Sequence, residues 1–269
     1  MKNITIIITT NPVEWWSPST KLIQHTTSQP VLQQLKSSSC MICCDVDSDK
    51  HEYYTNLQHV EYIFDEVRHM HNTPERNGLK WLMINSAEQI KTPYVLFLEH
   101  DWFFEAEIDW NKLVELMDRY TFINKISFNK RTNEIMTKHP VPFKEDDPVV
   151  TNELVPRLGI PRFGCKNDTY MEYDERLKNS EIKLLRALRW TNNPFLARTT
   201  MFQQWMNSIN DGKTCRTSKG VEEVLISRYR SECYINGWDT TSNKWGVYIY
   251  GDFNDPRAVR HSNGKARHW

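Results

Sequence analysis

The stretch Tyr94-Val95-Leu96-Phe97-Leu98-Glu99-His100-Asp101 contains the most apolar run of the chain. Its first five residues follow one another without any polar alternation, which predicts a strand buried on both faces, as in a parallel sheet. The run ends abruptly at Glu99, so two carboxylates and an imidazole follow the expected strand directly. This stretch therefore predicts both a central strand and a polar site at the end of that strand.

The sequence before this run predicts strands and helices in alternation. A β-rich run covers Ile4–Thr9, and a second buried strand is expected at Cys40–Val46. Apolar residues at helical spacing predict one or two helices within Ser19–Leu35, which contains a proline, and another helix at Gly78–Gln89. This order of elements indicates an α/β protein with a doubly wound sheet.

The sequence after Asp101 predicts more elements of both kinds. Helices are expected at Trp110–Tyr120, Glu181–Arg189, Thr200–Ile209 and Val221–Arg230, and strands at Lys125–Asn129 and Trp245–Tyr250. Residues 138–163 hold five of the 12 prolines, which predicts an irregular, exposed segment of functional importance. No internal repeat or linker divides the chain, so we expect a single domain over residues 1–269.

The charge balance excludes several classes of partner. The chain has 269 residues with 34 basic and 34 acidic side chains, which leaves a formal net charge of zero. Non-specific nucleic-acid binding needs a broad basic surface, and a polybasic membrane-surface protein needs an excess of lysine and arginine. We therefore expect neither nucleic acid nor a membrane surface as a partner.

Targeting signals and cysteine usage favour a cytoplasmic protein. The apolar run after Asn3 is too short for a signal-peptide core, and no stretch approaches the roughly 20 apolar residues of a membrane helix. Three of the six cysteines, Cys40, Cys43 and Cys44, crowd one apolar segment. A structural zinc ion takes four ligands, so buried reduced thiols are favoured over a zinc site there.

Polar residues follow each of the three expected N-terminal strands. Ligands of open α/β sheets bind outside the carboxyl ends of the strands. Those ends carry Thr9 and Asn11, then Asp45, and finally the triplet Glu99-His100-Asp101. Carboxylates two residues apart at a strand end can share one Mg²⁺ or Mn²⁺ ion. The alternative is a solvated strand end that binds no metal.

The order of these features resembles a glycosyltransferase of the GT-A fold, which uses a nucleotide-sugar donor and usually a divalent metal. The triplet Glu99-His100-Asp101 is similar to the acidic D-x-D motif of that family, with Glu in place of the first Asp, which makes Asp101 the favoured metal ligand. Arg76-Asn77-Gly78 resembles the start of a donor-contacting R-N-x-G-x-x-x-A element, although Ala87 does not fall at its spacing.

Two later segments resemble further elements of this family. Gly220-Val221-Glu222-Glu223 is similar to the G-x-E-D motif that supplies a carboxylate base in inverting members. The resemblance favours Glu223 as the base, with Glu222 as the alternative. A carboxylate pair in a first helical turn is also favoured simply by the helix dipole. Near the C-terminus, His261 resembles the family's metal- or diphosphate-contacting histidine, with Glu99 as a further metal ligand.

The resemblance implies a fold and a division of labour. The fold is a single Rossmann-like GT-A domain with a central, mostly parallel sheet flanked by helices. Residues 1–130 would form the nucleotide-sugar-binding half, and residues 131–269 the acceptor-binding half and C-terminal tail. The residues expected to contact the donor are Thr9, Asn11, Asp45, Arg76, Gly78, Arg260 and Lys265.

The resemblance also implies an activity. A hexosyl or pentosyl group would pass from a nucleoside-diphosphate sugar, most simply a UDP-sugar, to a glycan hydroxyl with inversion. Mn²⁺ or Mg²⁺ would assist as a Lewis acid. Trp190-Thr191-Asn192-Asn193 begins a stretch similar to the acceptor-side segment of the family. Because indoles stack on the apolar faces of sugars, Trp102 and Trp190 join Asn193 as candidate substrate contacts.

Two other functions compete with this interpretation. A sugar-1-phosphate nucleotidyltransferase would carry a glycine-rich loop with a lysine after its first strand, but residues 9–13 contain no glycine. A catalytically inactive carbohydrate- or nucleotide-sugar-binding protein of the same fold is the second alternative. The glutamates that replace aspartates in both acidic motifs leave that alternative open.

Overall fold

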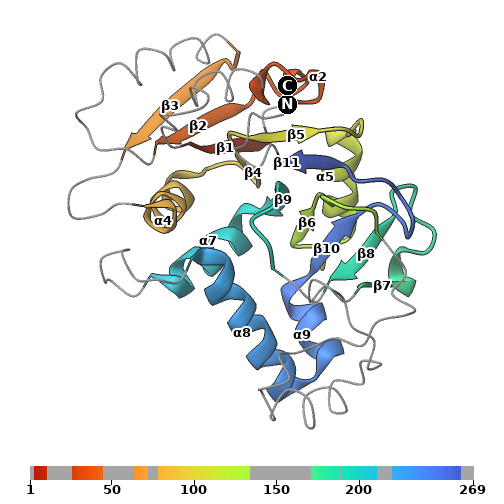
Figure 1. The fold of residues 1–269 in the computed structure, drawn as a ribbon. Coiled ribbons are helices and arrows are strands. Elements are labelled where there is room, and N and C mark those ends of the chain that lie inside the picture. Colours follow the sequence, from red (N-terminus) through yellow and green to blue (C-terminus); the bar gives the residue numbers. More distant parts are fainter. Residues whose placement is uncertain are drawn as a thin grey trace.

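A computed structural model describes residues 3–10, 26–44, 63–71, 78–133, 171–187, 190–210 and 220–261. The proline-rich segment 138–163 lies outside these residues, so the structure does not test the irregular segment expected there. The described residues form one large sheet, a short two-stranded ribbon and helices on both faces of the sheet (Figure 1). None of the described helices has both the length and the apolar character needed to cross a membrane.

The central sheet has nine strands in the order β3-β2-β1-β4-β9-β6-β10-β8-β7. Their bounds are β1 Ile4–Thr10, β2 Ser39–Cys44, β3 Glu66–His71, β4 Tyr94–Glu99, β6 Lys125–Ser127, β7 Met171–Tyr173, β8 Leu184–Ala187, β9 Phe195–Arg198 and β10 Val247–Tyr250. Within this sheet only β8 and β9 run against the others. The predicted α/β class with a mostly parallel sheet is therefore confirmed.

The parallel half of the sheet is buried on both faces, as its continuous apolar runs predict. In β1, Ile4, Ile6 and Ile8 pack on one face, whereas Ile7 packs on the opposite face. In β4 the even-numbered side chains share the face of Ile4, and the odd-numbered side chains share the face of Ile7. Glu99 continues the odd-numbered set of β4, so the strand alternation directs its carboxylate toward the Ile7 face.

Helices cover the two faces of the sheet (Figure 1). The Ile4 face packs against α2 (Pro30–Gln33) and α5 (Trp110–Arg119), and the Ile7 face packs against α4 (Leu79–Gln89), α7 (Thr199–Ile209), α8 (Val221–Asn236) and α9 (Trp238–Trp245). Helix α5 begins where Asp109 accepts a hydrogen bond from the backbone N–H of Lys112 at 3.1 Å. Each face thus carries its own hydrophobic core.

The cysteine-rich strand β2 belongs to these two cores. Cys40, Cys43 and Cys44 are free and buried, and burial raises the pKa of Cys43 to about 12. The thiol of Cys43 lies 3.9 Å from the sulfur of Met70 in the neighbouring strand β3. These side chains therefore pack as small apolar groups.

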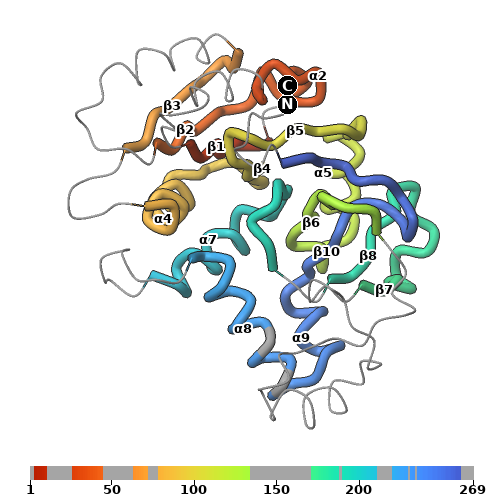
Figure 2. Tube along the Cα trace, viewed as in Figure 1, coloured from red at the N-terminus to blue at the C-terminus, as the bar shows by residue number. Residues whose placement is uncertain are grey.

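A two-stranded ribbon lies beside the carboxyl end of β4. Strand β5 (Trp102–Phe104) follows the acidic triplet, and β11 (Val259–His261) pairs with it antiparallel. Figure 2 shows the blue C-terminal trace returning to the yellow-green segment of β5. The register aligns His261 with Trp102 and Arg260 with Phe103. This pairing returns the C-terminal part of the described chain to the end of the central strand.

Several element predictions are corrected by the structure. The helix expected at Glu181–Arg189 is wrong, because β8 occupies Leu184–Ala187 between β10 and β7. Strands β3, β5, β7, β9 and β11 and helix α9 were not predicted. Within the predicted helical segment Ser19–Leu35, residues 19–25 lie outside the described residues, Thr26 and Thr27 are helical, and α2 covers Pro30–Gln33 and begins at its proline. The other predicted helices and strands occur within a few residues of their expected bounds, although α8 continues to Asn236.

Candidate functional site

The polar site begins where β1 and β4 end side by side. Thr9 and Glu99 occupy partner positions in the parallel register of these strands. The backbone N–H of His100 donates a hydrogen bond to the carbonyl oxygen of Thr9 at 2.9 Å, which continues the pairing into the turn after β4. The turn carries Asp101, which is 8% exposed, and delivers it to the start of β5. The sheet register therefore sets the position of both acidic residues.

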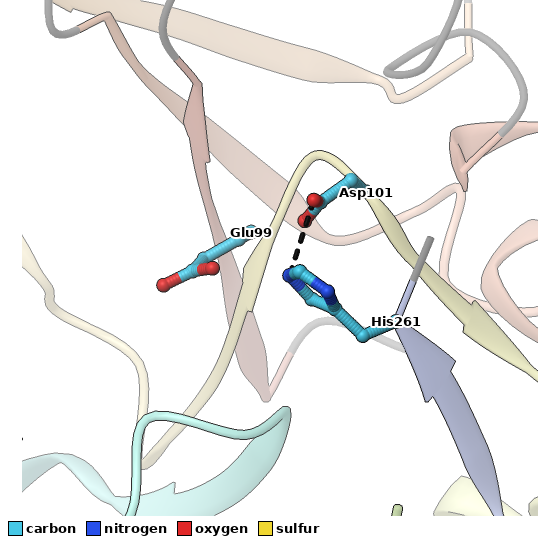
Figure 3. A group of neighbouring side chains, drawn as sticks. All are labelled: Glu99, Asp101 and His261. Atoms are coloured by element: carbon cyan, nitrogen blue, oxygen red, sulfur yellow. Dashed lines mark ion pairs between the residues drawn. The ribbon is translucent and has the colours of Figure 1, made fainter. Parts of the chain in front are cut away.

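Three side chains with metal-ligand atoms gather at this end of β4. The ligand atoms of Glu99, Asp101 and His261 all lie within 4.8 Å of one another. Nε2 of His261 lies 3.1 Å from Oδ2 of Asp101, as the dashed line in Figure 3 shows. The middle residue of the triplet, His100, is buried and does not belong to this cluster. The structure thus brings together the three residues that the sequence suggested as metal ligands.

The β5–β11 ribbon holds the histidine of this cluster in place. Because His261 pairs with Trp102 across the ribbon, its ring lies edge-on to the indole, with ring centroids 4.7 Å apart. The indole of Trp102 is 4% exposed and lines the same cavity as His261. A backbone pairing and a ring contact therefore fix the orientation of the imidazole toward Asp101.

The two carboxylates of the cluster have pKa values shifted in opposite directions. Burial, with the added repulsion of Asp101, raises the pKa of Glu99 to about 7, and the charge of Glu222 acts in the same direction. Burial also acts to raise the pKa of Asp101, but the hydrogen bond and charge of His261 outweigh it and hold this pKa below its ordinary value. Asp101 is thus ionised at neutral pH, and Glu99 lies in a position where negative charge is crowded.

These three residues fit a divalent cation. Oδ1 of Asp101 is buried and has no hydrogen-bond partner among the described residues, so one carboxylate oxygen remains available. Two carboxylates and one imidazole form a donor set that Mn²⁺ accepts readily, and Mg²⁺ accepts the oxygens. A cation there would also offset the repulsion that raises the pKa of Glu99. Asp101, Glu99 and His261 would hold the ion.

A cavity of about 480 Å³ opens beside the cluster. It is lined by Glu99, Trp102, Lys130, Arg131, Asn192, Asn193, Glu222, Arg257, Arg260 and His261. Four of these side chains are cationic, so the lining can accept a polyanionic group next to the candidate metal site. The volume lies in the range of small-molecule sites.

Glu105 holds two of the cavity's arginines. Its Oε1 lies 2.9 Å from Nε of Arg260 and 3.1 Å from an Nη atom of Arg257. A second oxygen of Glu105 contacts Nε of Arg257. The guanidinium of Arg260 also lies 5.1 Å from the centroid of the Phe103 ring. The arginines are therefore oriented before any ligand arrives.

The structure separates the two adjacent glutamates at the start of α8. Glu222 is half-buried and lines the cavity, whereas Glu223 is exposed and is not part of the lining. The charge of Glu222 is close enough to act on Glu99, which lines the same cavity. Glu222, which the sequence ranked second, is therefore the carboxylate that faces the cluster. The resemblance favoured Glu223, but the sequence could not place either side chain relative to the cavity, because that depends on how α8 is rotated against the sheet.

The remaining predicted site residues fall into three groups: those at the cavity or beside the cluster, those away from the cavity, and those outside the described residues. Arg260 and Asn193 line the cavity, and Thr9 is buried beside Glu99. Trp190 is fully buried in the core, where its ring contacts Phe195, so it offers no surface to a sugar. Gly78 is the N-cap of α4 with a φ of +91° and is not in the cavity lining. The predicted contacts that lie outside the described residues are Asn11, Asp45, Arg76 and Lys265.

Sequence reasoning overlooked four residues of the cavity lining, namely Lys130, Arg131, Asn192 and Arg257. Lys130 and Arg131 follow the strand expected at Lys125–Asn129, so the rule that ligands bind at strand ends could have found them. Asn192 directly precedes the predicted contact Asn193. Arg257 carried no such signal, because its position depends on the pairing of β11 with β5.

Comparisons with known proteins bear on the fold. No protein-family model matches the chain, and no curated protein matches its sequence. Among solved structures, S. aureus TarS 1-349 is similar with a TM-score of 0.50 and 13% identity over 97% of this chain and 60% of that one. GalNAc-T7 with UDP, GalNAc and Mn²⁺ is similar with a TM-score of 0.55 and 12% identity over 97% of this chain and 44% of that one.

These similarities show that the chain has the GT-A fold that its sequence resembles. The chain spans less than two thirds of the length of either structure.

Proposed function

We propose that this protein is a glycosyltransferase that moves a sugar from a nucleoside-diphosphate sugar, most simply a UDP-sugar, to a glycan hydroxyl. One observation carries the proposal. The cluster of Glu99, Asp101 and His261 adjoins a cavity whose cationic lining suits a diphosphate and whose lining also includes a carboxylate, Glu222. The GT-A fold supports it, as does the GalNAc-T7 structure of that fold, which contains UDP and Mn²⁺.

The proposed donor site is the part of the cavity next to the cluster of Glu99, Asp101 and His261. Mn²⁺ or Mg²⁺ held by Asp101, Glu99 and His261 would supply Lewis-acid stabilisation of the leaving diphosphate. Arg257 and Arg260 line the same cavity and would donate hydrogen bonds to the diphosphate oxygens. Thr9, at the neighbouring strand end, would contact the nucleotide, and we propose the same role for Asn11, Asp45, Arg76, Gly78 and Lys265.

The proposed acceptor site lies on the side of α8. As the acceptor hydroxyl attacks the anomeric carbon, its proton passes to a carboxylate oxygen of Glu222, which serves as general base. The leaving diphosphate departs from the opposite face of the sugar, so the product has inverted anomeric configuration. We prefer Glu222 to Glu223 because only Glu222 lines the cavity. Trp102 and Asn193 would contact the acceptor, and the transferred sugar would be a hexose or a pentose unit.

The division of the chain into halves belongs to the same proposal. Residues 1–130, which carry Glu99 and Asp101, would bind the donor. Residues 131–269, which carry Asn193 and Glu222, would bind the acceptor. The exceptions would be Arg257, Arg260, His261 and Lys265, which come from the C-terminal part and join the donor side.

The test combines binding with turnover. A panel of UDP-, GDP- and dTDP-sugars is screened by thermal shift with and without Mn²⁺, and release of the nucleoside diphosphate is then measured with a glycan acceptor. We expect one donor to stabilise the protein and to be consumed. E222Q should lower kcat by about 10²-fold or more without weakening donor binding.

The adjacent residue provides the matched control. E223Q removes the same charge from the same helical turn, so it should leave kcat unchanged if Glu222 alone is the base. Equal losses in both variants would contradict the assignment of the base. Donor binding without any turnover by the unaltered protein would instead identify an inactive binding protein of this fold.

A further inference from the structure

A lysine is completely buried beneath the acceptor side of the cavity. Lys125, at the start of β6, has no exposed surface. Its Nζ donates a hydrogen bond to the carbonyl oxygen of Thr191 at 2.7 Å. The same ammonium lies 4.3 Å from the centroid of the Trp190 ring and 4.4 Å from that of Phe195. The amino group is thus enclosed by one carbonyl oxygen and two aromatic faces.

Burial of this ammonium costs free energy that an apolar side chain at the same place would not cost. Burial lowers the pKa of Lys125 well below its ordinary value, and the charge of Glu222 acts in the opposite direction. The hydrophobic contacts around Lys125 would remain with a methionine of similar length. What the methionine could not supply is the hydrogen bond to Thr191 and the attraction to the two rings.

The hydrogen bond of Lys125 holds a segment that forms part of the cavity wall. Thr191, whose carbonyl accepts from Lys125, uses its own Oγ1 to accept a hydrogen bond from the backbone N–H of Asn193 at 3.1 Å. At the end of the segment, the carbonyl of Pro194 accepts from the backbone N–H of Phe128 at 2.9 Å. Asn192 and Asn193, between these two anchors, both line the cavity.

We propose that Lys125 is a positioning residue that holds the Trp190–Pro194 segment so that Asn192 and Asn193 form the acceptor-binding wall. The inference rests on the proposed glycosyl transfer. The side-chain amides of asparagine donate and accept hydrogen bonds, as sugar hydroxyls require. The wall shares the cavity with Glu222, the proposed base, whose charge also acts on Lys125. The ligand of this wall is therefore the hydroxyl-bearing acceptor.

Two variants test the proposal by different routes. K125M removes the buried donor and keeps an unbranched side chain that is one heavy atom shorter. T191A removes the hydroxyl that accepts from Asn193 and leaves the core intact, so it remains informative if K125M does not fold. In each variant we expect KM for the acceptor to rise about tenfold, with a smaller change in KM for the donor. K112M, at an exposed lysine paired with Glu181, should change neither constant.

Hydrogen–deuterium exchange supplies a readout that does not need turnover. In K125M and T191A, we expect the amide of Asn193 to exchange faster, while the amides of β6 keep their protection. Unchanged exchange of the Asn193 amide in K125M, or donor and acceptor KM values that rise equally, would overturn the proposal. If the unaltered protein transfers no sugar to any acceptor, the proposed function fails, whereas the exchange result still decides whether Lys125 positions this segment.

Discussion

At the end of β4, single residues with the same functional group lie in different electrostatic environments. The carboxylate of Asp101 has the imidazole of His261 beside it, whereas the carboxylate of Glu99 is repelled by the charges of Asp101 and Glu222. The first environment favours an ionised carboxylate, and the second disfavours one. A bound cation would relieve the second environment, because it adds positive charge next to Glu99.

A first prediction concerns metal binding by these residues. Mn²⁺ at about 100 times its Kd should raise Tm by roughly 5–10 °C, since binding to the folded state alone stabilises it by about 2.7 kcal/mol. D101A should abolish this shift because it removes the ionised ligand. Differential scanning fluorimetry with and without the ion measures the effect. E107A, at an exposed glutamate outside the cluster, should retain the full shift, and a full shift in D101A would exclude Asp101 as a ligand.

A second prediction concerns Glu105, which pairs with Arg257 and Arg260 at the cavity. A bound diphosphate would compete with this carboxylate for the same guanidinium groups. E105Q should therefore tighten the binding of UDP by about two- to fivefold, because an exposed ion pair that must be broken contributes up to about 1 kcal/mol. Isothermal titration calorimetry measures the Kd for UDP. Weaker binding in E105Q would show instead that Glu105 is needed to orient the arginines.

At the scale of secondary-structure elements, the turn between α9 and β10 is packed tightly against β6. Gly246 ends α9 with a left-handed φ of +56°, and its carbonyl accepts from the backbone N–H groups of Asn124 and Lys125. A Cβ at Gly246 would overlap the carbonyl oxygen of Phe122. The backbone conformation and the close approach both require glycine at this turn.

A third prediction follows for this turn. G246A should lower the free energy of unfolding by about 3 kcal/mol or more, because it combines a strained φ with a steric overlap of two backbone segments. G220A is the matched control, since Gly220 has a φ of −64° and a Cβ added there would meet no atom within 4 Å. G220A should lower the free energy of unfolding by less than about 1 kcal/mol. Urea denaturation compares the two, and similar losses would contradict this account.

Elements with strong local patterns could be predicted from the sequence, and those made by distant pairing could not. The run at Tyr94–Leu98 needed no context to be recognised as a buried strand. Residues 181–189 have a helical pattern of leucine, lysine and arginine, but pairing with β10 and β7 makes Leu184–Ala187 a strand. Strand β9 is inserted between β4 and β6, which precede it by many residues, so nothing local indicated its role.

At the scale of the whole molecule, a buried carboxylate links the far edge of the sheet to its interior. Oδ2 of Asp174, just before the 3₁₀ turn Glu175–Leu177, accepts from the hydroxyl of Tyr248 in β10 at 2.7 Å and from Arg176 at 2.6 Å. Burial acts to raise the pKa of Asp174, but these hydrogen bonds outweigh it and hold the pKa below its ordinary value.

A fourth prediction is the resulting dependence of stability on pH. Because the folded state lowers the pKa of Asp174, its stabilisation is complete above the unfolded value of about 3.9 and is lost as pH falls through the folded value. D174N should therefore lower the free energy of unfolding by about 1–3 kcal/mol at pH 7. On acidification it should lose less stability than the unaltered protein. Thermal unfolding from pH 7 to pH 3 measures both, with D65N as an exposed control. Parallel curves for D174N and the unaltered protein would contradict the prediction.

The three candidate metal ligands could be predicted from the sequence, but most of the residues that line the cavity could not. Glu99, Asp101 and His261 were recognisable because a carboxylate pair after a strand and a late histidine match a known pattern. The lining by Arg257 and the choice of Glu222 over Glu223 depend on the β5–β11 register and on the rotation of α8. Trp190 illustrates the converse, since its place beside a promising motif did not reveal that the core encloses it.

The pairing of β11 with β5 also has a consequence for the order of events during synthesis on the ribosome. Arg260 follows its partner Glu105 by 155 residues. At about 5–20 residues per second, Glu99 and Asp101 would leave the ribosome roughly 8–30 s before β11. A nascent chain, or one truncated before β11, therefore has both carboxylates but neither the histidine nor the ribbon that orients it. The proposed metal cluster is complete only after translation has passed His261, so any activity that depends on this cluster must wait until the residues up to His261 have been made.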